Sequence, residues 1–162
     1  MSSPDDLTHA RVAILGLGLI GGSLALALRG KCASLLGFDT EPQVAAQVQA
    51  LGVVDLGSTL PQEVLPQADM LVLAAPVRGI IQLLNQLPDW HPEPAVVMDV
   101  GSTKVEILEA MQDLPVRFDP LGGHPMCGKE HGSLANAEVG LFRNATFALT
   151  ALPRTSLHTR QL

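Results

Sequence analysis

Residues 11–29 contain the pattern that most restricts the fold of this chain. The aliphatic run Val12–Leu15 is typical of a buried strand, and Gly16, Gly18 and Gly21 follow it directly in the spacing G-x-G-x-x-G. Apolar residues at helical spacing come next. The stretch therefore predicts a strand, a tight turn and a helix in immediate succession.

The three glycines suit a turn that holds a dinucleotide. Gly16 permits the tight turn, Gly18 leaves room for a pyrophosphate beside the backbone, and Gly21 lets the helix lie close to the sheet. The N-terminus of the helix, which includes Leu19 and Ile20, presents unpaired N–H groups and a partial positive charge to the phosphates. We expect all five residues to contact or shape a cofactor site.

An acidic residue stands where such a site needs one. Asp39 ends the next apolar run, Leu35–Phe38, about twenty residues after Gly16, the distance at which a carboxylate meets the ribose hydroxyls. The alternative is an ordinary tight turn in which Asp39 initiates the following helix. Because positions 40–43 hold no Arg or Lys and Asp39 would repel a 2′-phosphate, NAD is expected rather than NADP unless a distant loop supplies a basic residue.

Composition excludes several functional classes. The 162 residues are enough for one domain with a proper core, and 47% hydrophobic against 16% charged residues excludes a disordered chain. A net charge of −6, without a basic cluster and with few aromatic residues, argues against a nucleic-acid surface. A small-molecule ligand is expected instead.

Neither a membrane nor an oxidising compartment is indicated. Residues 12–28 lack charge, but they are short for a membrane span, rich in glycine and preceded by Asp5 and Asp6 rather than by a basic region. Cys32 and Cys127 have no metal-ligand spacing and are expected to be free thiols in the cytoplasm.

Apolar runs and helical spacings alternate along the rest of the chain. This alternation predicts an α/β fold, a doubly wound and mostly parallel sheet of the Rossmann type. Pro76 ends a fully apolar strand and is expected beside the cofactor. We divide the chain into a lead-in at 1–10, a dinucleotide-binding domain at 11–152 and a tail or truncated linker at 153–162. Further strands are expected at 70–75, 95–100, 116–118 and 145–151, helices at 42–51, 77–87 and 103–112, a short helical or irregular passage at 60–68, and a proline-rich loop at 88–94.

A second group of polar residues follows one of these strands. Asp99, Ser102 and Lys104 lie at its carboxyl end, the edge of an α/β sheet where ligands bind. Thr103 and Glu106 have the spacing of a capping box, which is the structural explanation of this stretch. Lys104 in a first helical turn opposes the helix dipole by about 0.3–1 kcal/mol, so pairing with Asp99 or contact with an anionic ligand is a second explanation.

His124 lies in a glycine-rich stretch directly after a predicted strand. Pro125 favours an extended backbone at His124, and Gly122, Gly123 and Gly128 remove side chains around it. We expect an open, stiff loop that presents an imidazole, a group suited to proton abstraction near neutral pH. The remaining histidines are interpreted as surface or structural residues; they are His9, His91, His131 and His158.

Three motifs in this order resemble the prephenate and arogenate dehydrogenase family of tyrosine biosynthesis. They are Gly-Leu-Gly-Leu-Ile-Gly-Gly-Ser at 16–23, Asp-x-x-Ser-x-Lys at 99–104 and Gly-His-Pro-Met-x-Gly at 123–128. The first is shared with other nucleotide-binding dehydrogenases, whereas the other two together are much more specific. The resemblance covers about residues 11–151. One departure is Gly-Lys-Glu at 128–130, where Gly-Ser-Glu or Gly-Thr-Glu is more usual in the family.

The resemblance implies an NAD(P)-linked oxidative decarboxylation, in which hydride leaves a ring carbon as its 4-hydroxyl is deprotonated. Loss of the ring carboxylate then makes the ring aromatic. In this family the position of His124 is the catalytic base, and that of Ser102 assists beside the hydroxyl and the nicotinamide. Lys104 and Asp99 are expected to support the substrate or the structure. Full-length members are homodimers through a further helical domain, which supplies an arginine for the substrate, and nothing after Ala151 could build that domain.

Two other functions stay open at this level. A chain without the helical domain could be an NAD-binding module without turnover, and substrate-dependent reduction of NAD would separate these two functions. A dehydrogenase of another small acid, such as a 3-hydroxy acid, would share the Gly-Leu-Gly turn, but the His-Pro-Met sequence argues against it.

Overall fold

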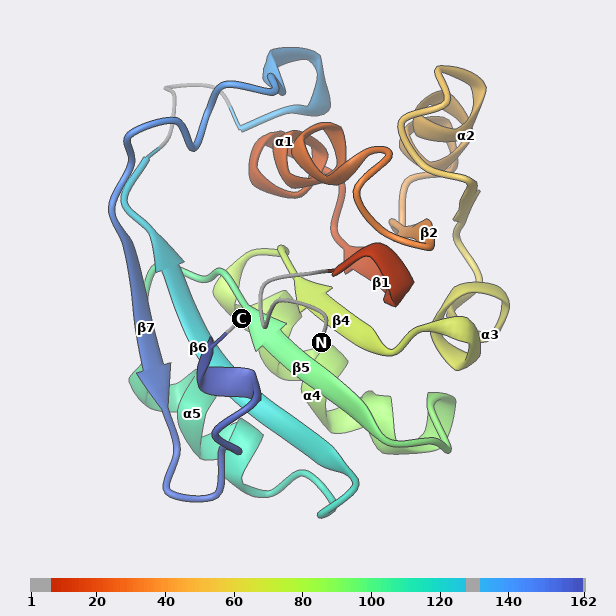
Figure 1. Ribbon diagram of the computed structural model, residues 1–162. Helices are drawn as coiled ribbons and strands as arrows, with labels where there is room; N and C mark the ends of the chain where they lie inside the picture. Colours follow the sequence, from red (N-terminus) through yellow and green to blue (C-terminus); the bar gives the residue numbers. More distant parts are fainter. Residues whose placement is uncertain (1–6, 128–131, 162) are drawn as a thin grey trace.

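A seven-stranded sheet is the centre of the computed structural model, which describes residues 7–127 and 132–161 (Figure 1). The strands are β1 (Arg11–Leu15), β2 (Ser34–Phe38), β3 (Leu56–Ser58), β4 (Met70–Leu73), β5 (Ala95–Asp99), β6 (Phe118–Pro125) and β7 (Phe147–Ala151). The helices are α1 (Leu19–Leu28), α2 (Pro42–Ala50), α3 (Pro61–Val64), α4 (Val77–Trp90) and α5 (Val105–Gln112), with 3-10 turns η1 (Leu7–His9), η2 (Leu65–Gln67), η3 (Leu134–Asn136) and η4 (Thr159–Gln161).

The strand order is β3-β2-β1-β4-β5-β6-β7, and β7 is antiparallel to β6 while the other neighbours are parallel. The chain winds outward from β1 in one direction and then returns to begin again at β4. This order confirms the predicted doubly wound, mostly parallel sheet. Ligands of such folds bind at the carboxyl ends of the strands where the order reverses, which here is between β1 and β4.

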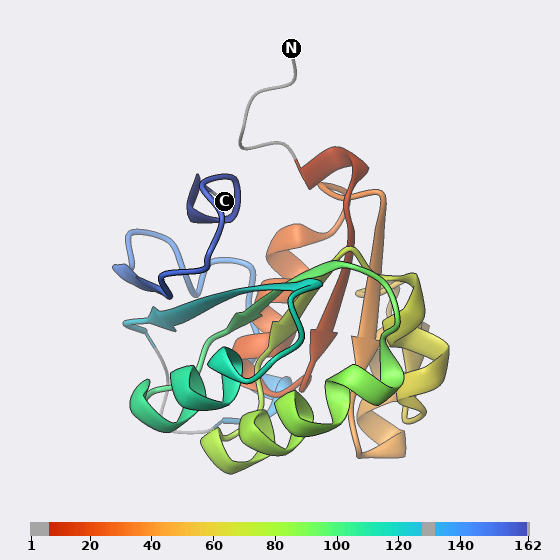
Figure 2. The ribbon, with the colours of Figure 1, turned by 90° about the horizontal axis from the view of Figure 1, so that it is seen from below.

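Helices cover both faces of the sheet because its central strands are apolar on both sides. In β1, Ala13 and Leu15 point into the core on the side of α4 and α5, whereas Val12 and Ile14 point into the core on the side of α1 and α2. This is the two-residue period of a strand buried on both faces. Figures 1 and 2 show the resulting three layers.

Helix α4 extends further than the sequence predicts. A loop was expected from residue 88, but α4 continues through Pro88 to Trp90. Pro88 lies in the last turn, and its fixed φ is compatible with a helix. The Arg117 guanidinium donates hydrogen bonds to the carbonyls of Pro88 and His91, at 2.7 and 3.3 Å. A cation therefore satisfies the exposed carbonyl end of the helix, where the dipole favours positive charge.

The predicted boundaries of the sixth strand are also wrong. Val116 is 97% exposed, and the strand begins at Phe118 and runs on through Gly122 and His124 to Pro125. These residues pair with β7, so His124 lies on a strand rather than in an open loop. Pairing with β7 outweighs the low strand propensity of Gly122 and Gly123. The three-residue strand β3 was not predicted at all.

The expected start of α5 is wrong as well. The helix begins at Val105 with Lys104 as its N-cap, and no side chain caps it. The Thr103–Glu106 capping box is therefore not formed.

Residues 153–161 pack against the sheet instead of extending as a free tail. η4 lies on the opposite side of β6 from α5 (Figure 2). The Thr159 hydroxyl donates to Asp119 Oδ2 at 2.6 Å, and the Ser156 N–H donates to Oδ1 at 3.0 Å. Burial alone would raise the pKa of Asp119, but these hydrogen bonds outweigh it and lower the pKa. This contribution to stability is present above the ordinary pKa of aspartate and is lost as the pH falls through the lowered value.

Little else is described at the amino end. Residues 1–6 of the expected lead-in lie outside the described residues, and η1 precedes β1 directly. Within the described ranges, no helix combines the length and the apolar character that crossing a membrane requires.

We predict that Thr155→Val weakens the attachment of the C-terminal residues. The buried Thr155 hydroxyl donates to Pro120 O at 2.6 Å and accepts from Leu152 N–H at 2.9 Å. Valine has nearly the same shape but leaves both backbone groups unpaired, which costs about 1–3 kcal/mol. Urea unfolding should show this loss, whereas Thr150→Val on the exposed strand β7 should change stability little. Equal midpoints for the two variants would contradict the observed packing.

Candidate functional site

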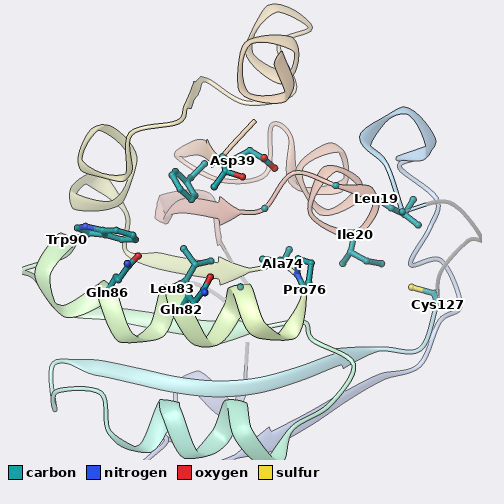
Figure 3. Close-up of a pocket in the computed structure, with 17 residues that line it drawn as sticks. Leu19, Ile20, Asp39, Ala74, Pro76, Gln82, Leu83, Gln86, Trp90 and Cys127 are labelled. Carbon is teal, nitrogen blue, oxygen red and sulfur yellow. The ribbon is translucent and has the colours of Figure 1, made fainter. Parts of the chain in front are cut away.

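A cleft of about 790 Å³ opens at the carboxyl ends of β1 and β4, where the strand order reverses (Figure 3). Its walls come from the glycine-rich turn and α1 on one side and from α4 on the other. Its lining residues include six of those expected to bind the cofactor, which are Gly16, Gly18, Leu19, Ile20, Asp39 and Pro76. The fold therefore brings three separate parts of the predicted cofactor site into one cavity.

Two glycines of the turn are required by its close packing. Gly16 has φ +96°, a conformation that disfavours other residues, and a Cβ there would lie 2.8 Å from Ala74 O. A Cβ on Gly21 would lie 1.8 Å from Gly16 O. Helix α1 therefore approaches β1 more closely than any side chain at position 21 would allow, and Gly21 shapes the site without lining it.

The N-terminus of α1 faces the cleft with little to neutralise it. Gly18 is the N-cap and offers no side chain, so the first N–H groups of the helix depend on other partners. Leu19 N–H donates to the Gly132 carbonyl at 2.9 Å, and that oxygen would lie 3.0 Å from a Cβ on Gly18. Gly132 thus borders the place where an anion would approach. No sequence signal pointed to this residue, because it lies more than a hundred positions from the turn.

The Asp39 carboxylate is held in a fixed orientation at the end of β2. Its Oδ2 accepts a hydrogen bond from Leu17 N–H at 2.7 Å, and Oδ1 accepts one from Glu41 N–H at 3.0 Å. Glu41 is the N-cap of α2, so Asp39 is not the residue that begins that helix. The side chain lines the cleft, which is the position required for binding a ribose.

Helix α4 contributes a wall that the sequence analysis did not assign. Gln82, Gln86 and Trp90 line the cleft at intervals of four residues, with Leu83 between them. Figure 3 shows these side chains along one face of α4, opposite Asp39. The four-residue spacing was visible in the sequence, but the loop predicted at Pro88 separated Trp90 from the rest of the helix.

A second polar cluster joins β5, α5 and β6. The side chain of Asp99 is fully buried and forms an ion pair with Lys104. Asp99 also accepts hydrogen bonds from Gly101 N–H at 2.8 Å and Gly123 N–H at 3.3 Å. The pairing of Lys104 with Asp99, one of the two explanations considered for this lysine, is confirmed.

His124 is part of the same cluster. Its Nδ1 lies 3.0 Å from Gly101 O. Because a carbonyl oxygen can only accept, Nδ1 carries a proton when the ring is neutral and Nε2 is left with a lone pair. Ser102 is exposed on the loop between β5 and α5, one residue beyond the acceptor Gly101. Its contact with the reacting groups stays a prediction.

Cys127 links the cluster to the cleft. It follows His124 by three residues and lines the cleft at the end opposite Trp90 (Figure 3). Partial burial raises the pKa of its thiol. Gly128 and Lys129, which complete the third motif and its departure from the family, lie outside the described residues.

A buried strand, a glycine-rich turn, an acid at the end of β2 and a cleft at the reversal of strand order define a Rossmann-type dinucleotide-binding domain. The chain belongs to the family described as prephenate dehydrogenase, nucleotide-binding domain, which matches residues 24–160. The resemblance inferred from the motifs is thus confirmed over most of the chain.

Relatives and solved structures agree with this assignment. The chain is 35% identical to a prephenate dehydrogenase of Bacillus subtilis over 89% of its own length, and 35% identical to that of Lactococcus lactis over 86%. It covers only 40% of each of these relatives, so it spans less than half of their length. The crystal structure of Aquifex aeolicus prephenate dehydrogenase with hydroxyphenyl propionate and NAD+ is 28% identical, with a TM-score of 0.86 over 97% of this chain and 56% of that one. Synechocystis arogenate dehydrogenase is 30% identical, with a TM-score of 0.85 over 93% of this chain and 53% of its own.

We predict that Gly21→Ala disrupts the glycine-rich turn. The added methyl group would overlap the Gly16 carbonyl, so α1 must move away from β1 at a cost of about 1–3 kcal/mol or more. Urea unfolding should report this loss, with Gly140→Ala as the control because a Cβ at position 140 meets no atom within 4 Å. If both alanine variants were equally stable, the close approach of α1 would be wrong.

Proposed function

We propose that this chain supplies the NAD site and the catalytic base for the oxidative decarboxylation of prephenate or arogenate. The observation that carries the proposal is the fixed imidazole of His124. It lies on β6, three residues before Cys127, which lines the cleft although His124 itself does not, and it belongs to the His-Pro-Met motif of the chain's family. The Aquifex relative, which binds NAD+ and hydroxyphenyl propionate, is consistent with a substrate that carries a ring hydroxyl.

The residues present fit NAD. The cleft offers the N-terminus of α1, which no side chain caps, for a pyrophosphate and the oriented Asp39 carboxylate for a ribose. Ile20 and Pro76 add apolar surface to the lining of the cleft. When bound, NAD would accept a hydride from the ring carbon that bears the 4-hydroxyl.

In this proposal the lone pair on His124 Nε2 takes the proton of the substrate hydroxyl as the hydride leaves. The hydroxyl carbon becomes a carbonyl, the bond to the ring carboxylate breaks, and carbon dioxide leaves. The electrons of that bond complete the aromatic ring, and the carbonyl oxygen regains a proton as a phenol. Because aromatisation provides driving force, the protein chiefly has to align the ring and accept one proton. Ser102 is proposed to assist beside the hydroxyl, and Lys104 with Asp99 to support the loop.

A second candidate is an NAD-binding module without turnover. It is favoured by one observation, that the residues lining the cleft are those expected for the cofactor, whereas His124 and Ser102 are not among them. The arginine that family members use for the substrate carboxylate, and their dimer contacts, belong to the helical domain implied by the resemblance. Binding of NAD alone therefore does not distinguish the two functions.

The deciding experiment is to follow the absorbance of NADH with the purified chain, NAD and either prephenate or arogenate. Formation of NADH with one substrate supports the dehydrogenase and names its substrate. Quenching of Trp90, the single tryptophan, by added NAD serves as the control for cofactor binding. Binding without NADH formation for either substrate would favour the module.

We predict that His124→Asn strongly lowers turnover but leaves NAD binding intact. Asparagine retains a polar side chain but has no group that accepts the hydroxyl proton, so kcat should fall by about 10²–10⁴-fold. NADH formation and Trp90 quenching measure the two effects separately. His91→Asn is a poor control because His91 is fully buried, whereas His158→Asn changes an exposed histidine and should have no effect on either. Near-normal turnover of His124→Asn would exclude it as the base.

We predict that Asp39→Ala lowers the preference for NAD over NADP. The change removes the ribose acceptor and also the negative charge that repels a 2′-phosphate. The dissociation constant of NADP divided by that of NAD, both measured by titration, should fall by at least about tenfold. The reason is that one charge repulsion toward NADP and one hydrogen bond to NAD are lost. Asp55→Ala, at an aspartate that accepts from Leu35 N–H and does not line the cleft, is the control. An unchanged ratio would contradict the role given to Asp39.

A further inference from the structure

The buried carboxylate of Asp99 contacts both sides of the hydrogen bond that orients His124. Its Oδ2 accepts from the N–H of Gly101, the residue whose carbonyl receives His124 Nδ1. Its Oδ1 accepts from the N–H of Gly123, the residue directly before His124. One side chain therefore ties the acceptor loop and the donor strand together.

The two residues that Asp99 binds must be glycines for this arrangement to form. A Cβ on Gly101 would lie 3.1 Å from Asp99 Oδ2 and 2.7 Å from Ile107 Cδ1. A Cβ on Gly123 would lie 2.6 Å from the Asp99 carbonyl oxygen. The close approach of both backbones is thus built into the sequence around Asp99.

Lys104 supplies the charge that the buried carboxylate needs. The Asp99 side chain is 0% exposed, and that of Lys104 is 19% exposed. A buried carboxylate without a cation would be strongly unfavourable, whereas the pair together with two backbone donors is a satisfied arrangement. Lys104 is then an internal counterion of Asp99.

We infer that Asp99 is a positioning residue, which holds Gly101 and Gly123 so that His124 is fixed with its proton on Nδ1 and its lone pair on Nε2. The inference rests on the proposed function, in which Nε2 is the base. It adds the reason why that nitrogen is available. A free imidazole can exchange its proton between the two nitrogens, whereas a carbonyl held against Nδ1 selects one tautomer.

The test is the tautomer of His124 in the whole chain, measured by long-range ¹H–¹⁵N correlation spectra at a pH where the ring is neutral. Comparison with His124→Asn assigns the signals. In the unchanged protein, Nδ1 should have the shift of a protonated nitrogen and Nε2 that of an unprotonated one. The opposite pattern would overturn the inference before any variant of Asp99 is made.

Asp99→Asn keeps the shape of the side chain but replaces one acceptor oxygen with a donor. One of the two backbone bonds must then be lost, and the tautomer ratio should shift toward Nε2–H by about fivefold, the effect of a single hydrogen bond. Asp99→Glu covers the case in which Asp99→Asn does not fold, because it retains the charge opposite Lys104 but moves both oxygens. It should shift the ratio in the same direction.

The control is Asp69→Asn. Asp69 also pairs with a cation and accepts a backbone N–H, both from Arg11, but it lies directly before β4, at the opposite end of the strands from Asp99. The Asp69→Asn variant should leave the tautomer of His124 unchanged. A folded Asp99 variant with an unchanged ratio would overturn the positioning role. If the ratio responds to Asp99 but neither substrate yields NADH, the proposed function fails and the positioning role stands.

Discussion

The contact between Gly21 and the Gly16 carbonyl decides where the rest of the cofactor site can form. It brings α1 against β1 so closely that a methyl group cannot be inserted. The N-terminus of α1 then lies at the carboxyl edge of the sheet, beside the reversal in strand order. Asp39, on the neighbouring strand, reaches the same turn by accepting a hydrogen bond from Leu17 N–H. The geometry of the cleft thus depends on a contact between backbone atoms, which the absence of a side chain at Gly21 makes possible.

The second cluster is organised by the opposite kind of interaction. Around Asp99 a buried charge, rather than the absence of a side chain, sets the distances. Burying an ion pair costs desolvation, so such a pair is weak evidence for stability by itself. The Asp99 carboxylate instead fixes the positions of its neighbours, because a carboxylate with four lone pairs can accept hydrogen bonds from several elements at once. The glycines beside it allow those donors to approach.

Much of the fold was predictable because the central strands have apolar runs buried on both faces. The runs at β1, β2, β4 and β5 were recognised on that basis. Three errors share a cause, which is that local composition was outweighed by tertiary contacts. Pro88 lies inside α4, where Arg117 satisfies the end of the helix. Gly122 and Gly123 lie in β6, where they pair with β7. Residues 153–161 pack on β6 rather than trail from it. The strand β3 has only three residues and left no pattern to detect.

The sequence by itself determined the class of fold, the glycine turn, the acid after β2 and the family, since each depends on residue types at fixed short spacings. Only the tertiary structure decided which distant residues meet. Trp90 joins Gln82 and Gln86 along the cleft because α4 continues past Pro88, and Gly132 reaches Leu19 across more than a hundred residues. Likewise, the tautomer of His124 depends on a carbonyl that the Asp99 carboxylate holds in place from a neighbouring strand. Hydrogen bonds between separate elements have no sequence period, so they appear only when the sheet brings those elements together.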